Sequence, residues 1–362
     1  MKLYVGILAI VAFTNAHTIF TTLFVNDVTQ GDGTCVRMNM TPNNCTSPVA
    51  SLTSDAMACG SSGQEPVAFT CPVAAGGKLT FEWRKWADAE QPGVLDISHK
   101  GPCAIYAKQL PDRRTSAAGS GWLKLWDEGY DATRGKWCTE KLMDANGLLS
   151  FAVPEGLPAG HWLFRPELLA LHNAEKNDPQ FYVGCAQVFV QTSNTAPLSM
   201  PATFNVSIPG HVKAGDPGLT FNIYAPHFPY PMPGPAVFVP PAPKTNSGKS
   251  GSGTGLVQTE GGVPADYLIK NANWVGVEVP DYMTEGGCWD SSEDCWKQAG
   301  RCYDTAPPSG SANCRVFEAK CQGIQDNCSA GNFVGPPNKG VKLVSEEPTP
   351  PSNIPVAVNV SP

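Results

Sequence analysis

Residues 17–238 consist largely of short runs in which apolar and polar side chains alternate. Residues 78–86 are a clear example, because Leu79, Phe81 and Trp83 alternate with polar neighbours. Similar runs, separated by turn-forming Pro, Gly, Asn and Asp, occur at 19–25, 104–108, 122–126, 148–153, 181–191, 203–208 and 219–224. A period of two is typical of strands that bury one face. The pattern predicts a mainly β fold, an antiparallel immunoglobulin-like β-sandwich with long loops, over residues 17–239.

Composition limits the partners and the compartment of this chain. Its 362 residues include 36 Gly and 34 Pro, a turn-rich profile. Residues 1–16 carry one early cation (Lys2), an apolar run and the small residue Ala16, the layout of a signal peptide too short to span a bilayer. Without Lys2 the formal charge changes from −7 to −8 (24 basic against 32 acidic residues), which argues against nucleic-acid or membrane partners. We expect a secreted, extracellular monomer.

Secretion also predicts covalent modification. Thirteen cysteines in an extracellular chain predict disulfide bonds, with one thiol left over. Five Asn-x-Ser/Thr acceptors fit a secreted glycoprotein: Asn39, Asn44, Asn205, Asn327 and Asn359.

The C-terminal third divides into three stretches. Residues 240–279, rich in Pro, Gly and Ser, predict a flexible linker, and residues 333–362 predict a disordered tail. Residues 280–332 hold two triplets of cysteines spaced by seven, which places each triplet on one face of a helix. Six cysteines allow fifteen pairings. The mirror symmetry favours a disulfide-stapled α-helical hairpin with the pairs Cys288–Cys328, Cys295–Cys321 and Cys302–Cys314.

Three aromatic residues, Trp289, Trp296 and Tyr303, repeat with the same spacing beside these cysteines. On a helix they would lie about 10.5 Å apart along one flank, comparable to the disaccharide repeat of a β-glucan. Two interpretations stay open: the rings cover the disulfides, or they form a platform on which sugars stack.

Cleavage after Ala16 would make His17 the first residue of the mature protein. Its α-amino nitrogen, with an ordinary pKa of about 7.7 to 8.0, and a ring nitrogen could then chelate one ion. With a further imidazole, such a nitrogen-rich site suits Cu(II) best among divalent metals, although an N-terminal histidine can also arise by chance. His99 lies in a turn before a strand, and alternation sends Gln180 and Tyr182 to one face. His161, His211 and His227 are interpreted as structural or surface residues.

A set of fragments, in order, carries a family resemblance. Besides His17 they are Ser98-His99-Lys100-Gly101-Pro102, Gly121-Trp122-Leu123-Lys124, Lys136-Trp137, Leu157-Pro158-Ala159-Gly160, Arg165 through Gln180-Phe181-Tyr182, and Tyr230-Pro231-Met232-Pro233-Gly234-Pro235. Over residues 17–238 the sequence resembles the fungal lytic polysaccharide monooxygenases of auxiliary activity family 9.

The resemblance implies one copper ion held by the amino nitrogen and Nδ1 of His17 and by Nε2 of His99, with Tyr182 near the axial position. His172 and Gln180 would position and protonate the oxidant. The implied reaction hydroxylates C1, C4 or both in a β-1,4-glucan such as cellulose, using O2 or H2O2 and an external electron donor, either a small reductant or a redox protein. Tyr230 is a candidate aromatic on the flat substrate-binding face; packing against the proline run is an equal alternative.

The resemblance also implies a Cys59–Cys185 bridge. Strand proximity suggests Cys103–Cys138 and Cys35–Cys71, which would leave Cys45 free. Three other functions remain to be excluded: a copper scavenger without oxidase activity, a non-catalytic carbohydrate-binding protein, and a glycoside hydrolase, for which no carboxylate pair stands out.

Overall fold

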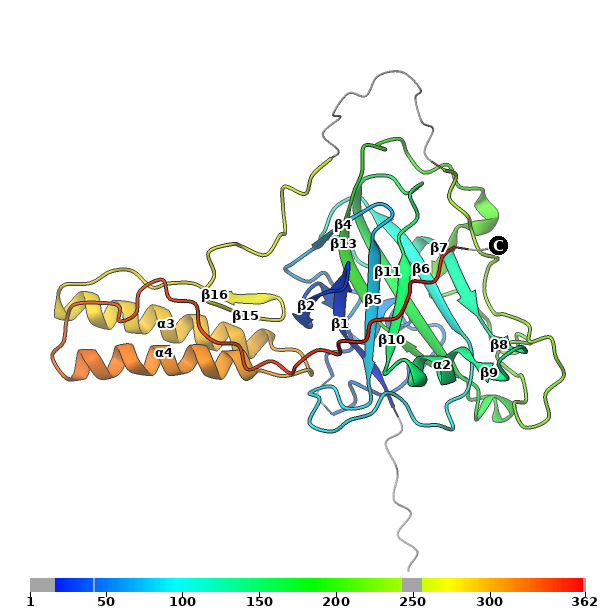
Figure 1. Cartoon of the computed structure of the whole chain (residues 1–362), viewed down its shortest axis with the longest axis horizontal. Coiled ribbons are helices and arrows are strands. Elements are labelled where there is room, and N and C mark those ends of the chain that lie inside the picture. The colour runs from blue at the N-terminus through cyan, green and yellow to red at the C-terminus, as the bar shows by residue number, and fades with distance from the viewer. Residues whose placement is uncertain (1–16, 42, 243–255, 361–362) are drawn as a thin grey trace, which may run out of the picture.

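In a computed structural model, residues 17–41, 43–242 and 256–360 are described; the predicted signal peptide lies outside them. Two sheets form the main body (Figure 1). The smaller sheet has the order β10-β5-β1-β2 and comprises β1 (Ile19–Val25), β2 (Val28–Asp32), β5 (Lys78–Arg84) and β10 (Leu148–Ala152).

The larger sheet has the order β14-β7-β6-β11-β13-β3, with β12 paired to β11 and β4 paired to β13. Its strands are β3 (Val36–Arg37), β4 (Cys71–Ala74), β6 (Cys103–Leu110), β7 (Gly119–Glu128), β11 (Gly160–Ala170), β12 (Gln180–Val183), β13 (Cys185–Gln191) and β14 (Val206–Ile208). Neighbouring strands are antiparallel except β4 and β13, which are parallel. The sandwich expected from alternation is confirmed.

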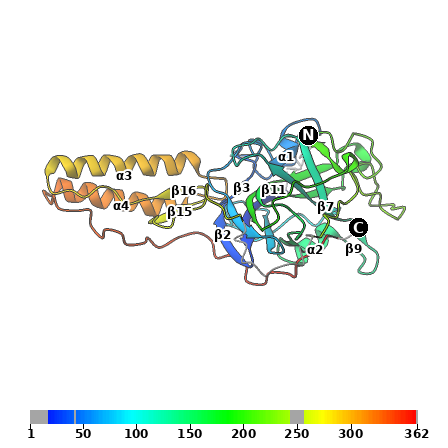
Figure 2. The same cartoon turned by 90° about the horizontal axis from the view of Figure 1, so that it is seen from above.

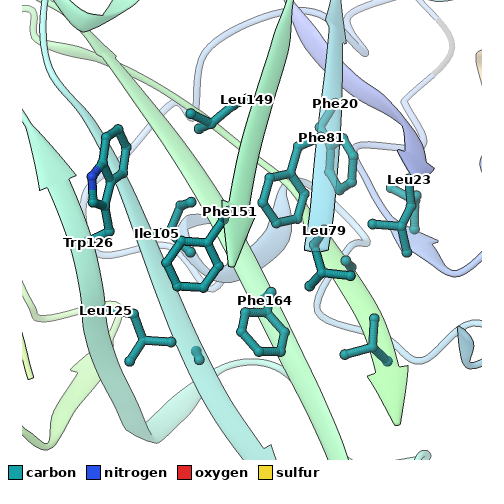
Figure 3. Close-up of a cluster of buried hydrophobic side chains, with 14 of the residues drawn as sticks. Phe20, Leu23, Leu79, Phe81, Ile105, Leu125, Trp126, Leu149, Phe151 and Phe164 are labelled. Atoms are coloured by element: carbon teal, nitrogen blue, oxygen red, sulfur yellow. The ribbon is translucent and has the colours of Figure 1, made fainter. Parts of the chain in front are cut away.

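The core lies between the two sheets. Figure 3 shows side chains of β1, β5 and β10, such as Phe20, Phe81 and Phe151, pointing toward Ile105 and Phe164 of the larger sheet. These side chains are almost fully buried. The apolar members of each alternating run therefore supply the packing that holds the sheets together.

Short elements complete the sandwich. They are α1 (Ala56–Cys59), α2 (Cys138–Asp144), the 3-10 turns Ala174–Lys176 and Ala202–Phe204, and the two-stranded pair β8 (Tyr130–Asp131) and β9 (Lys136–Trp137). Disulfides join the cysteines in the pairs Cys35–Cys71, Cys59–Cys185 and Cys103–Cys138. Cys45 carries a free thiol. The run 219–224, expected to be a strand, is a succession of turns.

The C-terminal helical hairpin is present as expected. Helices α3 (Glu285–Thr305) and α4 (Ala312–Ser329) lie side by side (Figure 2) and are joined by three disulfides, Cys288–Cys328, Cys295–Cys321 and Cys302–Cys314. Neither these helices nor any shorter one among the described residues has the length and hydropathy to cross a membrane.

The described residues of the predicted linker and tail pair with other parts of the chain. Residues 243–255 lie outside the description, but Leu256 pairs with Thr192, and β15 (Ile269–Asn271) with β16 (Trp274–Gly276) forms a small β-hairpin. The tail crosses the smaller sheet (Figure 1): Pro348 and Thr349 lie beside Glu82 and Arg84 of β5, and Val358 pairs in parallel with Phe151 at the free edge of β10. The described parts of both segments hydrogen-bond to the sandwich.

Candidate functional site

Three aromatic rings meet at one end of the sandwich. His17 lies two residues before the start of β1, His99 lies in the turn before β6, and Tyr182 lies in β12. Ring centroids are 6.3 Å apart for His17 and Tyr182, and 5.9 Å apart for His99 and Tyr182. Backbone pairing sets this convergence, since β12 lies antiparallel to β11 with Tyr182 opposite Leu168.

A polar relay fixes the tautomer of His99. The Ser98 hydroxyl donates to Oδ1 of Asp96 at 2.7 Å and lies 3.1 Å from Nδ1 of His99. Because the hydroxyl has a single hydrogen, which is given to the carboxylate, Nδ1 of His99 must carry a proton and donate to Ser98. Nε2 is then left with a free lone pair, and it is buried without a hydrogen-bond partner. This is the atom that the family resemblance assigns as a copper ligand.

All three histidines of the site favour the neutral form. Burial, followed by the charge of His172, lowers the pKa of His99 to about 4. Burial and His172 also lower the pKa of His17, and burial lowers that of His172. Neutral imidazole is the form that binds metal ions.

His172 and Gln180 stand beside these rings. The His172 ring stacks on His99 with centroids 4.1 Å apart, and its buried Nδ1 has no hydrogen-bond partner. Gln180 accepts a hydrogen bond from the Tyr182 hydroxyl at 3.0 Å and donates to Asp178 at 3.0 Å. These two bonds fix the orientation of the Gln180 amide.

Burial, followed by the charge of Asp178, raises the pKa of Tyr182. The phenol therefore stays protonated at neutral pH. Sequence reasoning missed Asp96, Ser98 and Asp178, because only the folded turns bring them against the expected residues.

The donor set fits a copper ion. His17 and His99 provide two neutral imidazoles, and one free nitrogen is buried without a partner. No group of three or more His, Cys, Asp or Glu side chains with metal-binding geometry occurs in the described part of the chain. A third donor at this site would therefore be the α-amino nitrogen of His17, which exists only after cleavage at Ala16. Nitrogen donors of this kind suit copper.

The sequence model of Auxiliary Activity family 9 (formerly GH61) matches residues 17–230, more than half of the chain. The chain belongs to this family. The family's match begins at His17 and includes every residue of the site described above.

Curated relatives within the family extend the match beyond the sandwich. AA9 family lytic polysaccharide monooxygenase C of Aspergillus tamarii is 47% identical over 348 residues, which covers 92% of this chain and 90% of the relative. Monooxygenase H of Botryotinia fuckeliana is 49% identical over 331 residues, covering 89% of this chain and 75% of the relative. Shares this large include the helical hairpin as well as the sandwich.

A solved structure matches the sandwich. The structure of CvAA9A is similar with a TM-score of 0.54 and 32% sequence identity, and the match covers 61% of this chain and 98% of CvAA9A.

Tyr230 and Tyr224 differ in their surroundings. Tyr230 is half-buried, its ring packs edge-on against Trp137 and Phe221, and its hydroxyl donates to the carbonyl of Gly218. The structure thus favours the packing interpretation. Tyr224, by contrast, is 67% exposed and its hydroxyl donates to the carbonyl of His172 at 3.2 Å.

The remaining histidines have structural or surface positions. His211 is buried and lies 3.3 Å from the carboxylate of Glu167, while His161 packs against Phe189. His227 is exposed.

Proposed function

We propose that the mature chain, beginning at His17, is a secreted copper-dependent monooxygenase that cleaves β-1,4-glucan by oxidation at C1, C4 or both. The observation that carries the proposal is the buried, partner-free Nε2 of His99, whose ring lies 5.9 Å from the ring of Tyr182, with the His17 ring 6.3 Å from the same tyrosine. Copper bound by His17 and His99 would supply one-electron chemistry with O2 or H2O2, using electrons from an external donor. Family membership supports oxidative polysaccharide cleavage as the reaction class.

The chain's own residues would control protons around the metal. Tyr182 commits its hydroxyl hydrogen to Gln180, so it would stay a neutral phenol beside the metal rather than bind it as a phenolate. The Gln180 amide uses one N–H for Asp178 and keeps the second for an oxidant. His172 has a free Nδ1 that can accept or release a proton beside His99. We assign Gln180 and His172 to positioning and proton transfer.

Substrate would bind over the end of the sandwich that carries His17 and Tyr224. The exposed Tyr224 ring is tethered to the backbone of His172, so a sugar stacked on it would lie close to the metal ligands. Asn44, Asn205 and Asn359 are exposed and can carry glycans on a secreted protein.

The test is mass spectrometry of soluble products from amorphous cellulose, using copper-loaded mature protein with and without ascorbate. We expect oxidised oligosaccharides that require both reductant and copper and that disappear in His99→Ala. The matched control is His161→Gln, at the opposite end of β11 from His172, about 30 Å along the strand. Tight copper binding with no oxidised product from any β-glucan would contradict the proposal.

A further inference from the structure

The helical hairpin has two different faces. On one face, Ser291 donates to the carbonyl of Pro280, and Gln298 accepts from the backbone N–H of Val277. The β15–β16 hairpin covers α4 on the same face, where Trp274 packs edge-on against Phe317. The chain therefore occupies this face with its own residues.

The three aromatic residues of α3 lie on the opposite face. Trp289 precedes Ser291 by two positions and Trp296 precedes Gln298 by two, which is about 200° around a helix. Trp289 and Tyr303 are 42% and 40% exposed, and Trp296 between them is partly buried against the cysteine-containing core of the hairpin. Nothing among the described residues is bonded across this face except side chains of α4.

Partners on α4 fix two of the rings. Trp296 donates from Nε1 to Gln325 at 2.8 Å, and Tyr303 donates from its hydroxyl to Glu318. Glu318 and Gln325 are themselves seven residues apart, so the same ring-and-acceptor unit occurs twice with a repeat of about 10.5 Å. Rings that merely covered the disulfides would not need this repetition.

Gly300 keeps the space between Trp296 and Tyr303 open. A Cβ added there would meet nothing within 4 Å, so packing does not require glycine at this position. Glycine disfavours a helix interior more than any residue except proline. Gly300 lies four residues after Trp296 and three before Tyr303, on the same face of the helix. Without a side chain there, the surface between the two rings stays open.

We infer that this face binds a single β-1,4-glucan chain along α3, with Trp289, Trp296 and Tyr303 stacking under successive disaccharide units. Carboxylates border the rings, because Glu293 lies between the two tryptophans on the helix face and Glu318 lies beside Tyr303. Glu293 is ion-paired with Lys297 at 2.6 Å, and Glu318 accepts from Tyr303; the remaining lone pairs of both carboxylates can accept hydrogen bonds from the hydroxyls of a neutral sugar chain. The choice of glucan rests on the proposed function.

The aromatic face has a fixed position relative to the sandwich. Asn273 accepts from the backbone N–H of Cys35 and donates to the carbonyl of Gly33, and the Lys270 ammonium donates to the carbonyl of Gln30. Figure 2 shows the hairpin projecting from the sandwich beside these contacts. Glucan bound on α3 would therefore be held at a fixed position relative to the sandwich.

Pull-down of the full mature chain on amorphous cellulose, without reductant, tests the inference. The double variant Trp289→Ala/Tyr303→Ala should bind about tenfold more weakly, while Trp289→Tyr should retain most of the binding. The matched control is Trp86→Ala, which removes a 37% exposed tryptophan from the sandwich. Unchanged binding in the double variant, with or without a lower melting temperature, would overturn the inference.

Gly300→Leu gives a second test that removes no ring. Leucine favours a helix and fills the gap beside Trp296, so binding should fall while the protein stays folded. Equal binding by Gly300→Leu and the unmodified chain, or preferential capture by polygalacturonate, would overturn the inference. His99→Ala separates this site from the copper site: it should abolish oxidation and leave hairpin-dependent binding intact.

Discussion

Ser98 is the residue that decides which nitrogen of His99 is free. It passes the charge of Asp96 to Nδ1 of His99 through two hydrogen bonds of 2.7 and 3.1 Å. Partners of this kind set the tautomer and orientation of a histidine ligand, and their removal costs about 10- to 100-fold in metal affinity.

We predict that Ser98→Ala weakens Cu(II) binding to the mature protein by that factor, because His99 loses the acceptor that holds its Nδ1 proton. Isothermal titration of the copper-free protein measures the affinity, and the electron paramagnetic resonance spectrum of Cu(II) reports the ligand geometry. Ser98→Thr keeps the hydroxyl and should bind as the unmodified chain does. Equal affinity in Ser98→Ala would rule out the relay.

The buried Glu167 carboxylate should make the folded protein less stable at acid pH. It is buried between Arg165, whose Nη1 is 2.7 Å away, and His211. Burial alone would raise its pKa, but Arg165 and His211 lower the pKa from 4.5 to about 2. The stabilisation is complete above pH 4.5 and is lost as the pH falls toward 2, a change on the order of 3 kcal/mol.

Urea unfolding between pH 7 and 2.5 should show this loss. Glu167→Gln should lower the free energy of unfolding at pH 7 by about 3 to 5 kcal/mol, because Arg165 stays buried without its carboxylate, and should flatten the dependence below pH 4.5. The exposed Glu155→Gln serves as control. An unchanged slope in Glu167→Gln would place the acid sensitivity elsewhere.

The sequence indicated the residues proposed to act at the copper site, but it did not indicate the residues that hydrogen-bond to them. Gln180 and Tyr182 lie two positions apart on one strand, so alternation alone places them together. Asp96 and Asp178 act through turns whose geometry carries no comparable pattern. The sequence left both interpretations of Tyr230 open for the same reason, since the loop that half-buries Tyr230 and exposes Tyr224 has no period.

At the level of elements, periodicity predicted strands and helices that bury one face. The run 19–25 is β1 without any change of bounds, and the cysteine spacing predicted both helices. The expected strand at 219–224 failed because the Asn222 side chain accepts from the backbone N–H groups of Tyr224 and Ala225, which forms a turn. Local hydrogen bonds from a side chain to the backbone compete with the β-strand pairing that alternation alone predicts.

Asn273, which the sequence placed in a linker, connects the β15–β16 hairpin to the sandwich. Its Oδ1 accepts from the backbone N–H groups of Cys35 and Phe69, and its Nδ2 donates to Gly33. Asn273→Ala leaves these buried groups without partners, so we predict about 1 to 3 kcal/mol of lost stability.

The loss should be local. Hydrogen exchange should accelerate at the amides of Cys35 and Phe69 and across β15 and β16, while the copper affinity stays unchanged. The exposed Asn353→Ala is the control variant. If the Cys35 amide exchanges as slowly in Asn273→Ala as in the unmodified chain, Asn273 does not hold the β15–β16 hairpin against the sandwich.

On the scale of the whole molecule, the tail lies beside polar residues of the smaller sheet. Thr80 and Ser150 share a buried hydrogen bond, and Arg84 pairs with Asp32 and Glu82 at less than 10% exposure of each residue. Alternation placed Thr80, Glu82, Arg84 and Ser150 on the polar face of their strands. The tail lies beside Glu82 and Arg84 and pairs with the edge of β10, which no local pattern in residues 333–362 could indicate, because its contacts are with strands more than 200 positions earlier in the sequence.

Two valines near the C-terminus test this pairing directly. Val358 packs against the sandwich core and exchanges backbone hydrogen bonds with Ser150 and Ala152, whereas Val356 is 91% exposed. We predict that Val358→Asp lowers the free energy of unfolding by about 2 kcal/mol or more, because a carboxylate is placed against apolar side chains, and that Val356→Asp changes it by less than about 0.5 kcal/mol. Calorimetry should show the difference as a melting temperature lower by several degrees for the first variant alone. Equal melting temperatures would mean that the tail does not pair with the edge of β10 in solution.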